Sequence, residues 1–310
     1  ARVFFILRLY ISLFRHKNII IMHAKLIKPV YLLSKFSFKR HKIICWIHGI
    51  EVWGREYNSV KNHLIKVDGF LSDSSNTVET MIKKNFPKEI FKVVNPMSSL
   101  IDETIKPIYE KNEVFSLLTV SRIDRSENYK GHDLIVSALD LLINKKKLVK
   151  NIEWNIVGSG DGMEELIKLI YKYKLESYIT ILGSISDEQL KNIFLKCSVF
   201  IMPSNFGLKE NGFATGEGFG IAYLEAAFAA KPSIACKLGG QTDIIKDKKN
   251  GILVDPSPKS VSEAIYSYYK SYDLIQCHGK EARLTAENKF SKKIFQENLL
   301  NSMKYFNIFE

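Results

Sequence analysis

The chain has 310 residues, of which 46% are hydrophobic and 25% charged; this length suits about two domains and this balance is typical of a globular protein. Such a composition excludes disordered, collagen-like and coiled-coil chains, and the apolar runs are too short for a membrane-spanning helix. Four isolated cysteines, at 45, 197, 236 and 277, exclude a zinc knuckle and a disulfide framework and favour a reducing compartment such as the cytoplasm.

The net charge of +12 belongs to one end of the chain. Residues 1–50 hold ten Lys or Arg and no acidic residue, while the remainder is nearly balanced. Such a segment suits an anionic membrane surface, an acidic substrate or nucleic acid, and a solvated surface is the alternative without a ligand. Nucleic acid is disfavoured because no recognised binding motif accompanies the charge.

Residues 1–110 are predicted to form a first α/β domain. The elements expected there are a helix at 1–14, strands at 18–22, 42–47, 70–72 and 91–94, a helix between the first two strands, and a helix at 77–84. Asn76 is the expected N-cap of that last helix, with Glu79 as its partner. The region begins with a helix, so we expect residues of this domain to precede Ala1.

A polar segment at 99–112 separates this region from a second one, 111–279. The final region, 280–310, is predicted to form one helix at 280–306, which could cross back to the first domain. The second region repeats the alternation of strands and helices that is typical of a doubly wound parallel sheet. Its expected strands are 114–120, 152–157, 178–182, 198–202, 233–236 and 252–254, and its expected helices are 132–143, 163–174, 187–195, 221–230, 241–246 and 259–271.

Ligands of such sheets bind in the loops that follow the strands. Arg122 and Lys130 frame the first of these loops, and two such cations suit a diphosphate. Gly158, Gly160 and Gly162 follow the next strand, where a nucleotide loop and a plain tight turn are equally consistent with the pattern. The spacing is not G-x-G-x-x-G and no acidic residue ends the following strand, which disfavours a nicotinamide cofactor.

The strongest local pattern runs from Gly216 to Ala226. Glycines at 216, 218 and 220 precede a helix whose N-terminal amides could receive a diphosphate. Glu217 lies in this loop, and Glu225 follows on an apolar helix, where burial is expected. A buried carboxylate needs partners, either ligand hydroxyls or a basic side chain.

These motifs together resemble the retaining glycosyltransferases of family 4. The matching residues are Ser121-Arg122, Lys130–Asp133, Val157–Asp161, Glu217–Gly220 with Leu224–Ala226, Lys231–Ala235, Gly239-Gly240 with Asp243, and Gly251–Asp255. Glu217 and Glu225 match the family's E-x7-E motif. The resemblance covers residues 114–260 closely and 18–96 more loosely, through Trp46–Gly49.

The resemblance implies an α/β protein of the GT-B fold, with two Rossmann-like doubly wound parallel-sheet domains facing a cleft. Residues 1–110 would serve the acceptor and residues 111–279 the nucleotide-sugar donor. Two features depart from the family pattern: no strand with a Gly-rich loop comes before the first helix, and Val94–Met97 stands where a glycine is usual.

The resemblance also implies roles for individual residues. Arg122 and Lys130 would bind the donor diphosphate, and amides at Phe219, Gly220 and Ile221 would assist them. Gly160 and Ser184–Ser186, with Ile185 at the centre, would border the nucleobase. Glu225 would bind the ribose hydroxyls, Glu217 the transferred sugar, and His48 would approach the reacting carbon, with a core histidine as its alternative.

The function expected is transfer of a hexose from a UDP- or GDP-sugar to a lipid-linked or glycan acceptor in bacterial surface polysaccharide synthesis, on the cytoplasmic side of the membrane. A non-catalytic nucleotide-sugar-binding homologue is the first alternative and a nicotinamide oxidoreductase the second. No cofactor and no metal ion are expected, because Asp-x-Asp is absent and cations and amides can offset the leaving-group charge.

Anionic lipid is a further expected partner of residues 1–50. Seven aromatic residues lie among the basic ones, at positions 4, 5, 10, 14, 31, 36 and 38. Some of them are expected in the core of the first domain, which leaves 35–42 as the one stretch expected to be both basic and exposed.

Overall fold

The computed structural model describes residues 2–37, 40–110 and 113–308 and divides the chain into two compact units. Unit 1 comprises Ala1–Pro96, Gly207–Ala214 and Phe295–Glu310, and unit 2 comprises Met97–Phe206 and Thr215–Ile294. Phe38, one of the aromatic residues counted above, and the side chain of Phe5 lie outside the described part of the chain.

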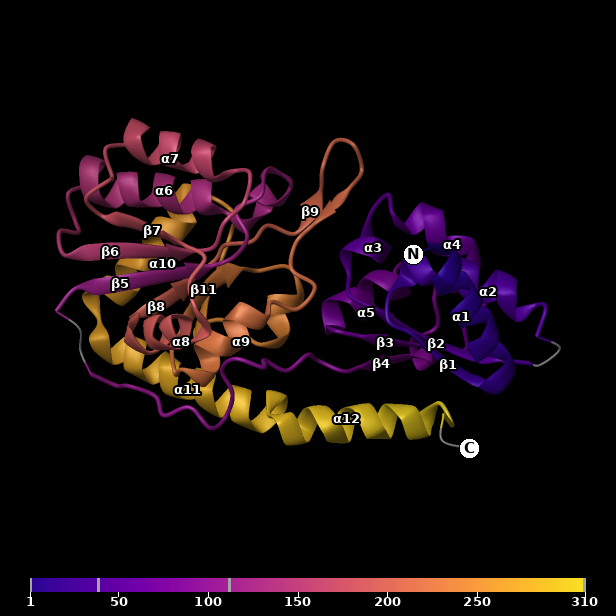
Figure 1. The fold of residues 1–310 in the computed structure, drawn as a ribbon. Coiled ribbons are helices and arrows are strands. Elements are labelled where there is room, and N and C mark those ends of the chain that lie inside the picture. The colour runs from indigo at the N-terminus through magenta and orange to yellow at the C-terminus, as the bar shows by residue number, and fades with distance from the viewer. Residues whose placement is uncertain (1, 38–39, 111–112, 309–310) are drawn as a thin grey trace. The chain divides into compact units, whose positions relative to one another are not determined.

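Unit 1 is built on a four-stranded parallel sheet with the order β1-β2-β3-β4. Its strands are β1 (Asn18–Ile21), β2 (Lys42–Ile47), β3 (Gly69–Ser72) and β4 (Phe91–Val93), each close to its predicted position. Its helices are α1 (Arg2–Arg15), α2 (Ile27–Ser34), α3 (Ile50–Trp53), α4 (Tyr57–Leu64) and α5 (Ser75–Ile82) (Figure 1). The strands are almost continuously apolar because a parallel sheet is covered on both faces.

The predicted cap of α5 is wrong. Ser74, not Asn76, is the N-cap, and its hydroxyl accepts a hydrogen bond from the amide of Thr77 at 3.4 Å. Ser74 has the extended backbone that an N-cap requires, whereas Asn76 already lies in the first turn. Neither α3 nor α4 is predicted from the sequence, because both are short and α4 is largely polar.

Unit 2 contains a six-stranded parallel sheet with the order β12-β11-β8-β5-β6-β7. Its strands are β5 (Phe115–Val120), β6 (Ile152–Val157), β7 (Ile179–Gly183), β8 (Val199–Ile201), β11 (Ser233–Cys236) and β12 (Gly251–Val254). The order runs outward in both directions from the neighbouring pair β5 and β8. This pair is therefore the point where the strand order reverses, next to which open α/β sheets bind ligands.

Helices cover both faces of this sheet (Figure 1). One core contains buried side chains of α6 (His132–Asp140), α7 (Met163–Lys172) and α10 (Pro258–Lys270). The other contains side chains of α8 (Asp187–Lys196), α9 (Ile221–Phe228) and α11 (Tyr272–Phe290). The doubly wound arrangement predicted from the alternating pattern is thus present in unit 2.

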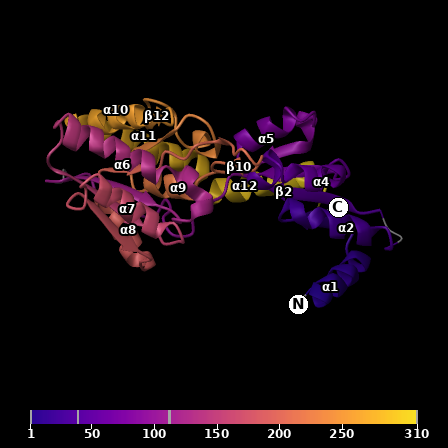
Figure 2. The ribbon, with the colours of Figure 1, turned by 90° about the horizontal axis from the view of Figure 1, so that it is seen from above.

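Two of the helices predicted for this part of the chain differ from the structure. The helix expected at 241–246 is only a 3-10 turn, Gly240–Asp243, because the amide of Lys246 is taken by the Asn250 side chain at 2.6 Å. The helix expected at 280–306 is two helices, α11 and α12 (Lys292–Tyr305), separated by Ser291, whose backbone is extended. Both helices are labelled in Figure 2.

The division of the chain also differs from the predicted limits of 110 and 279. Residues 97–110 pack with unit 2, where Ile101 is buried and Arg283 donates to the carbonyl oxygen of Glu103 at 2.6 Å. The segment Gly207–Ala214 clusters with unit 1, where its Gly212 carbonyl accepts from the amide of Arg55 at 2.8 Å. Backbone hydrogen bonds of this kind leave no residue pattern in the sequence.

Among the residues that the structure describes, none of the helices has the length and hydropathy of a membrane span.

Candidate functional site

Most predicted site residues of unit 2 lie at one edge of its sheet. Arg122 follows β5, Gly160 follows β6, Ile185 follows β7, and Glu217 lies between β8 and α9. These loops follow parallel strands, so they share the carboxyl edge of the sheet, beside the reversal between β5 and β8. The edge selected from the sequence is the one at which the fold places ligands.

Lys130 and Glu217, 87 positions apart in the chain, form an ion pair at this edge. The ammonium of Lys130 lies 2.7 Å from Oε1 of Glu217, which also accepts a hydrogen bond from the Ser204 hydroxyl at 3.0 Å. Glu217 is only 9% exposed. A buried carboxylate is stable when it is paired and hydrogen-bonded in this way. Ser204 was not predicted from the sequence, where one serine after a strand carries no distinctive signal.

Arg122 has a different environment. Its side chain is 71% exposed, and its guanidinium is paired with the Glu127 carboxylate and lies 4.0 Å from that of Asp124. Both predicted diphosphate-binding cations are therefore matched by carboxylates of the same unit. Glu127 was not singled out in the sequence, because one Glu in a loop rich in charged residues is unremarkable.

Glu225 is buried, as its apolar helix predicted. It is 8% exposed, and its Oε1 accepts a hydrogen bond from the hydroxyl of Ser98 at 2.8 Å. Burial raises the pKa of the Glu225 carboxyl to about 6, against the opposing effect of the Ser98 hydrogen bond. Within the described part of the chain, no Lys or Arg pairs with Glu225, so the alternative of a basic partner is wrong. This leaves a buried carboxylate with capacity for ligand hydroxyls.

The glycines after β6 allow two loops to approach each other. A Cβ on Gly158 would lie 1.8 Å from the carbonyl oxygen of Ser121, and one on Gly160 would lie 2.5 Å from that of Ile123. The amide of Ile123 also donates to the carbonyl of Ser159 at 3.0 Å. Gly160 thus lies directly against the loop that carries Arg122. Ile185 is half-buried and packs on the apolar core of unit 2.

The N-terminus of α9 is shaped by the other glycines. Gly220, its N-cap, has φ +92°, and a Cβ there would meet the ring of Tyr223 at 2.5 Å. Phe219 is buried and its ring packs on that of Phe290, with centroids 5.6 Å apart, so only its backbone can serve a ligand. Ile221, the first residue of the helix, is exposed. The arrangement leaves helix amides available for an anion.

His48 belongs to unit 1, at the end of β2. Its Nδ1 lies 2.7 Å from Oδ2 of Asp73, and its Nε2 lies 2.7 Å from the carbonyl oxygen of Met22. The hydrogen bond to Asp73 is the main cause that raises the pKa of His48 to about 9. Both ring nitrogens face acceptors, so the imidazole is doubly protonated at neutral pH. His48 is half-exposed, so the alternative that it is a core histidine is wrong.

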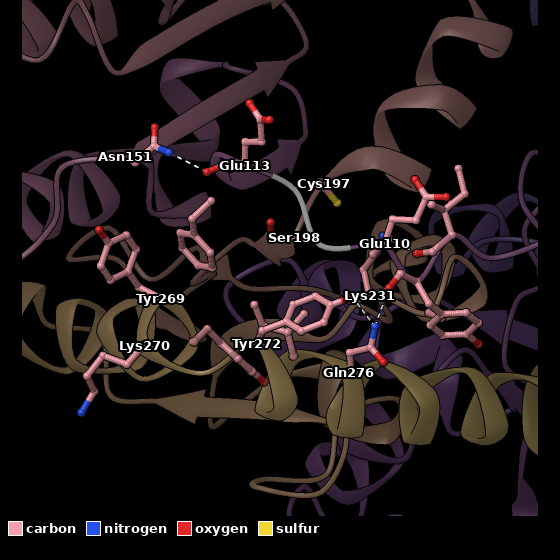
Figure 3. A pocket seen from close by; sticks show the side chains of 16 residues that line it. Glu110, Glu113, Asn151, Cys197, Ser198, Lys231, Tyr269, Lys270, Tyr272 and Gln276 are labelled. Atoms are coloured by element: carbon pink, nitrogen blue, oxygen red, sulfur yellow. Dashed lines mark hydrogen bonds between the residues drawn. The ribbon is translucent and has the colours of Figure 1, made fainter.

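The cavity drawn in Figure 3 is lined by none of these residues. It measures about 370 Å³ and belongs to unit 2. Its wall includes Phe115, which begins β5, and Asn151 and Ser198, which directly precede β6 and β8; Lys231 lies two residues before β11. Its place is therefore the amino edge of the sheet, opposite the candidate site.

The part of the chain that the structure describes contains no group of three or more His, Cys, Asp or Glu side chains placed to hold a metal ion.

Comparison with known families gives one match that covers more than half of the chain. The family described as glycosyl transferases group 1 matches residues 102–285. The chain belongs to this family. The match covers most of unit 2, where Arg122, Lys130, Glu217 and Glu225 lie.

Named relatives support this membership. The human alpha-1,3/1,6-mannosyltransferase ALG2 is 29% identical over 220 residues, which are 66% of this chain and 49% of ALG2. A GDP-mannose-dependent alpha-(1-6)-phosphatidylinositol monomannoside mannosyltransferase of Mycobacterium tuberculosis is 31% identical over 137 residues, 44% of this chain and 34% of the relative. The chain thus spans about half, or less, of the length of these relatives.

Solved structures of glycosyltransferases share the fold. Anabaena Alr3699/HepE in complex with UDP and glucose has a TM-score of 0.78 at 17% identity and covers 96% of this chain and 81% of its own. The lipopolysaccharide outer core galactosyltransferase WaaB has a TM-score of 0.76 at 18% identity and covers 96% and 78%. The GT-B fold predicted from the sequence is confirmed by this likeness.

Proposed function

We propose that this group 1 glycosyltransferase transfers a hexose, with retention of configuration, from a UDP- or GDP-sugar to a lipid-linked or glycan acceptor in bacterial surface polysaccharide synthesis. The observation that carries the proposal is the grouping of Arg122, Lys130, Glu217 and Glu225 at the carboxyl edge of unit 2, beside the strand-order reversal. Two cations, two buried carboxylates and a helix N-terminus match the charges and hydroxyls of a nucleotide sugar.

Each of these groups is proposed to bind a different part of the donor. Glu225 accepts hydrogen bonds from the ribose hydroxyls, Lys130 and Arg122 bind the diphosphate, and Glu217 orients the transferred sugar. The loop around Gly160 and Ile185 borders the nucleobase, chiefly through its backbone. His48 is proposed to approach the sugar near the reacting carbon.

The reaction needs stabilisation of charge on the leaving nucleoside diphosphate. Lys130, Arg122 and the α9 amides supply it, and we propose that no metal ion or other cofactor is required. Activity should then survive excess chelator. Loss of turnover with chelator, restored by magnesium or manganese, would contradict this part of the proposal.

The names of the relatives do not decide whether the donor is a UDP-sugar or a GDP-sugar. The M. tuberculosis relative is named as GDP-mannose-dependent. A Streptococcus agalactiae relative, 25% identical over 248 residues, is named UDP-N-acetylglucosamine--peptide N-acetylglucosaminyltransferase GtfA subunit, and the HepE structure contains UDP. We propose that the backbone makes most contacts to the base, so the side chains of this chain do not distinguish the two.

A thermal-shift panel of nucleotide sugars, followed by a turnover assay, tests the proposal. UDP- or GDP-sugars should raise the melting temperature, and Arg122→Ala or Lys130→Ala should lower turnover by about 10²–10³, the usual cost of removing a group that stabilises transition-state charge. Wild-type rates from both variants would refute the assignment. Binding without turnover would favour the alternative, a non-catalytic nucleotide-sugar-binding homologue.

We also propose that unit 1 docks on anionic lipid at the inner face of the cytoplasmic membrane. Of the seven aromatic residues counted in the sequence, the five with described side chains are all at least partly exposed: Phe4, Tyr10, Phe14, Tyr31 and Phe36. On α1, Arg8 and Arg15 are exposed beside Leu7 and Ile11. The prediction that only 35–42 is both basic and exposed is therefore wrong, and α1 has the composition of an interfacial helix.

A further inference from the structure

The loop after β5 contains an acidic residue between the two cations of the candidate donor site. Glu127 lies in the 3-10 segment Arg125–Lys130. Its Oε1 is paired with the guanidinium of Arg122, and its Oε2 lies 4.0 Å from the ammonium of Lys130. One carboxylate thus faces both groups that are proposed to receive the diphosphate.

The burial of Glu127 is unusual for a loop carboxylate. Its side chain is 12% exposed, whereas that of its partner Arg122 is 71% exposed. Its Oε2 is buried and has no hydrogen-bond partner. A buried carboxylate oxygen without a donor is costly, so this position is held by the attraction of the two cations and not by a full set of hydrogen bonds.

The charges around this position cancel. Arg122 and Lys130 supply two positive charges, and Glu127 and Glu217 two negative ones; Asp124 lies 4.0 Å from Arg122 as well. A nucleoside diphosphate adds about three negative charges at neutral pH. It therefore enters a site that is neutral or slightly negative unless a carboxylate withdraws.

We propose that Glu127 is an internal counter-ion that competes with the donor diphosphate for Arg122 and Lys130. It neutralises the two cations in the empty site and releases Arg122 when the diphosphate takes its place. Glu217 is less suited to this role, because the Ser204 hydroxyl also holds it in place. The inference rests on the proposed function, since it requires a diphosphate at these cations.

The test is the affinity of UDP and GDP for Glu127→Gln, measured by calorimetry at low ionic strength. Gln keeps the size of the side chain and removes its charge. Removing a like charge next to the diphosphate should tighten the binding of whichever nucleotide the wild-type chain binds by about tenfold. The gain should shrink at 1 M salt, where the screening length falls to about 3 Å, although a buried carboxylate is screened less than an exposed one. Uridine and guanosine, which lack the diphosphate, should bind both proteins equally.

Glu165→Gln is the matched control. Glu165, in the first turn of α7, is also paired with an arginine, Arg125, at 2.6 Å, but it is exposed and lies outside the proposed diphosphate contacts. Its variant has the same net charge as Glu127→Gln and should bind nucleotides like the wild type. Glu127→Asp, which keeps the negative charge, should also stay close to the wild-type affinity.

The outcomes separate this inference from the proposed function. If the wild type binds a nucleotide and Glu127→Gln binds it equally or more weakly, Glu127 is a positioning partner of Arg122 and the inference is overturned. Equal tightening in Glu165→Gln would also overturn it, because a general charge effect would then suffice. A wild-type chain that binds neither nucleotide refutes the proposed function and this inference together.

Discussion

The ionisable residues of the candidate site have environments that depend on their partners more than on the residue type. Glu217 is stabilised by Lys130 and Ser204, while Glu225 is buried with one hydroxyl and no basic partner in the described part of the chain. The two carboxylates of one sequence motif therefore have different partners. Burial is the main cause that raises the pKa of Glu225 to about 6.

We expect Glu225→Gln to weaken nucleotide binding and to stabilise the folded chain. Because the folded pKa of Glu225, about 6, lies above its ordinary value of 4.5, the stability cost of its burial builds up as pH rises from about 4.5 to about 6 and is complete above that range. The shift corresponds to about 2 kcal/mol at pH 7.5, so the free energy of unfolding should rise by up to that amount. Urea denaturation measures the gain, and calorimetry with UDP or GDP measures the loss of affinity.

The pH dependence gives an independent check on Glu225. Ribose hydroxyls donate to the ionised carboxylate, so the affinity of the wild type should fall as pH drops below about 6. The Gln variant should lose this component of the fall, while titration of the nucleotide phosphate stays common to both. Glu217→Gln should instead reduce turnover more than affinity. Unchanged affinity in Glu225→Gln would contradict its assignment to the ribose.

A second prediction at this scale concerns His48. Its pKa of about 9 lies above the ordinary 6.5, so its contribution to stability is complete below pH 6.5 and is lost as pH rises through about 9. Asp73→Asn removes the main cause and should bring the pKa of His48 down by at least one unit. NMR titration, with His48→Gln to assign the signal, measures both. A wild-type signal that titrates near 6.5 would refute the double protonation.

The loops are the elements that bring these side chains together. Gly158 follows β6 with φ +140° and lies against the carbonyl oxygen of Ser121, so the loop of Arg122 depends on the absence of a side chain there. Gly240 similarly lies against Gly218, where its Cβ would meet the carbonyl oxygen at 2.0 Å, and its amide donates to the Glu217 carbonyl at 2.8 Å. These glycines therefore allow the loops to approach each other closely, in addition to any contact that they make with a ligand.

We expect Gly158→Ala to destabilise unit 2 by about 2–3 kcal/mol or more, because it combines a strained φ with a clash against backbone. Gly183→Ala is the matched control: Gly183 also has a positive φ, +65°, but has no atom within 4 Å of its Cβ position. It should cost about 1 kcal/mol. Equal losses of unfolding free energy in urea for the two variants would show that strain alone, and not loop contact, requires Gly158.

At the scale of the whole molecule, the charge asymmetry is the dominant feature. The excess of ten cations in residues 1–50 is carried by unit 1, and α1 exposes Phe4, Leu7 and Ile11 beside it. Each basic residue close to an anionic bilayer is worth about 1 kcal/mol. Several of them, together with burial of apolar side chains among the headgroups, would give useful affinity.

We expect the chain to sediment with anionic vesicles at low salt and to dissociate at 1 M salt, where screening shortens to about 3 Å. The double variant Arg8→Glu/Arg15→Glu should reduce binding at least tenfold. Tyr171→Ala, which removes an exposed aromatic side chain of unit 2, should leave it unchanged. Equal binding to neutral and anionic vesicles, or none to either, would leave the basic segment as solvated surface or an acceptor site.

The sequence by itself determined the fold class, the strands of the two parallel sheets and the loops that carry the candidate site residues, because apolar strand runs and loop glycines are local patterns. It also determined that Glu225 is buried, since its helix is apolar around it. Tertiary structure alone decided the partners: Ser98 for Glu225, Ser204 for Glu217, Asp73 for His48 and Glu127 for Arg122. It likewise assigned Gly207–Ala214 to unit 1. The physical reason is that hydrogen bonds and ion pairs form between residues brought together by folding, and a single sequence carries no record of which groups will meet.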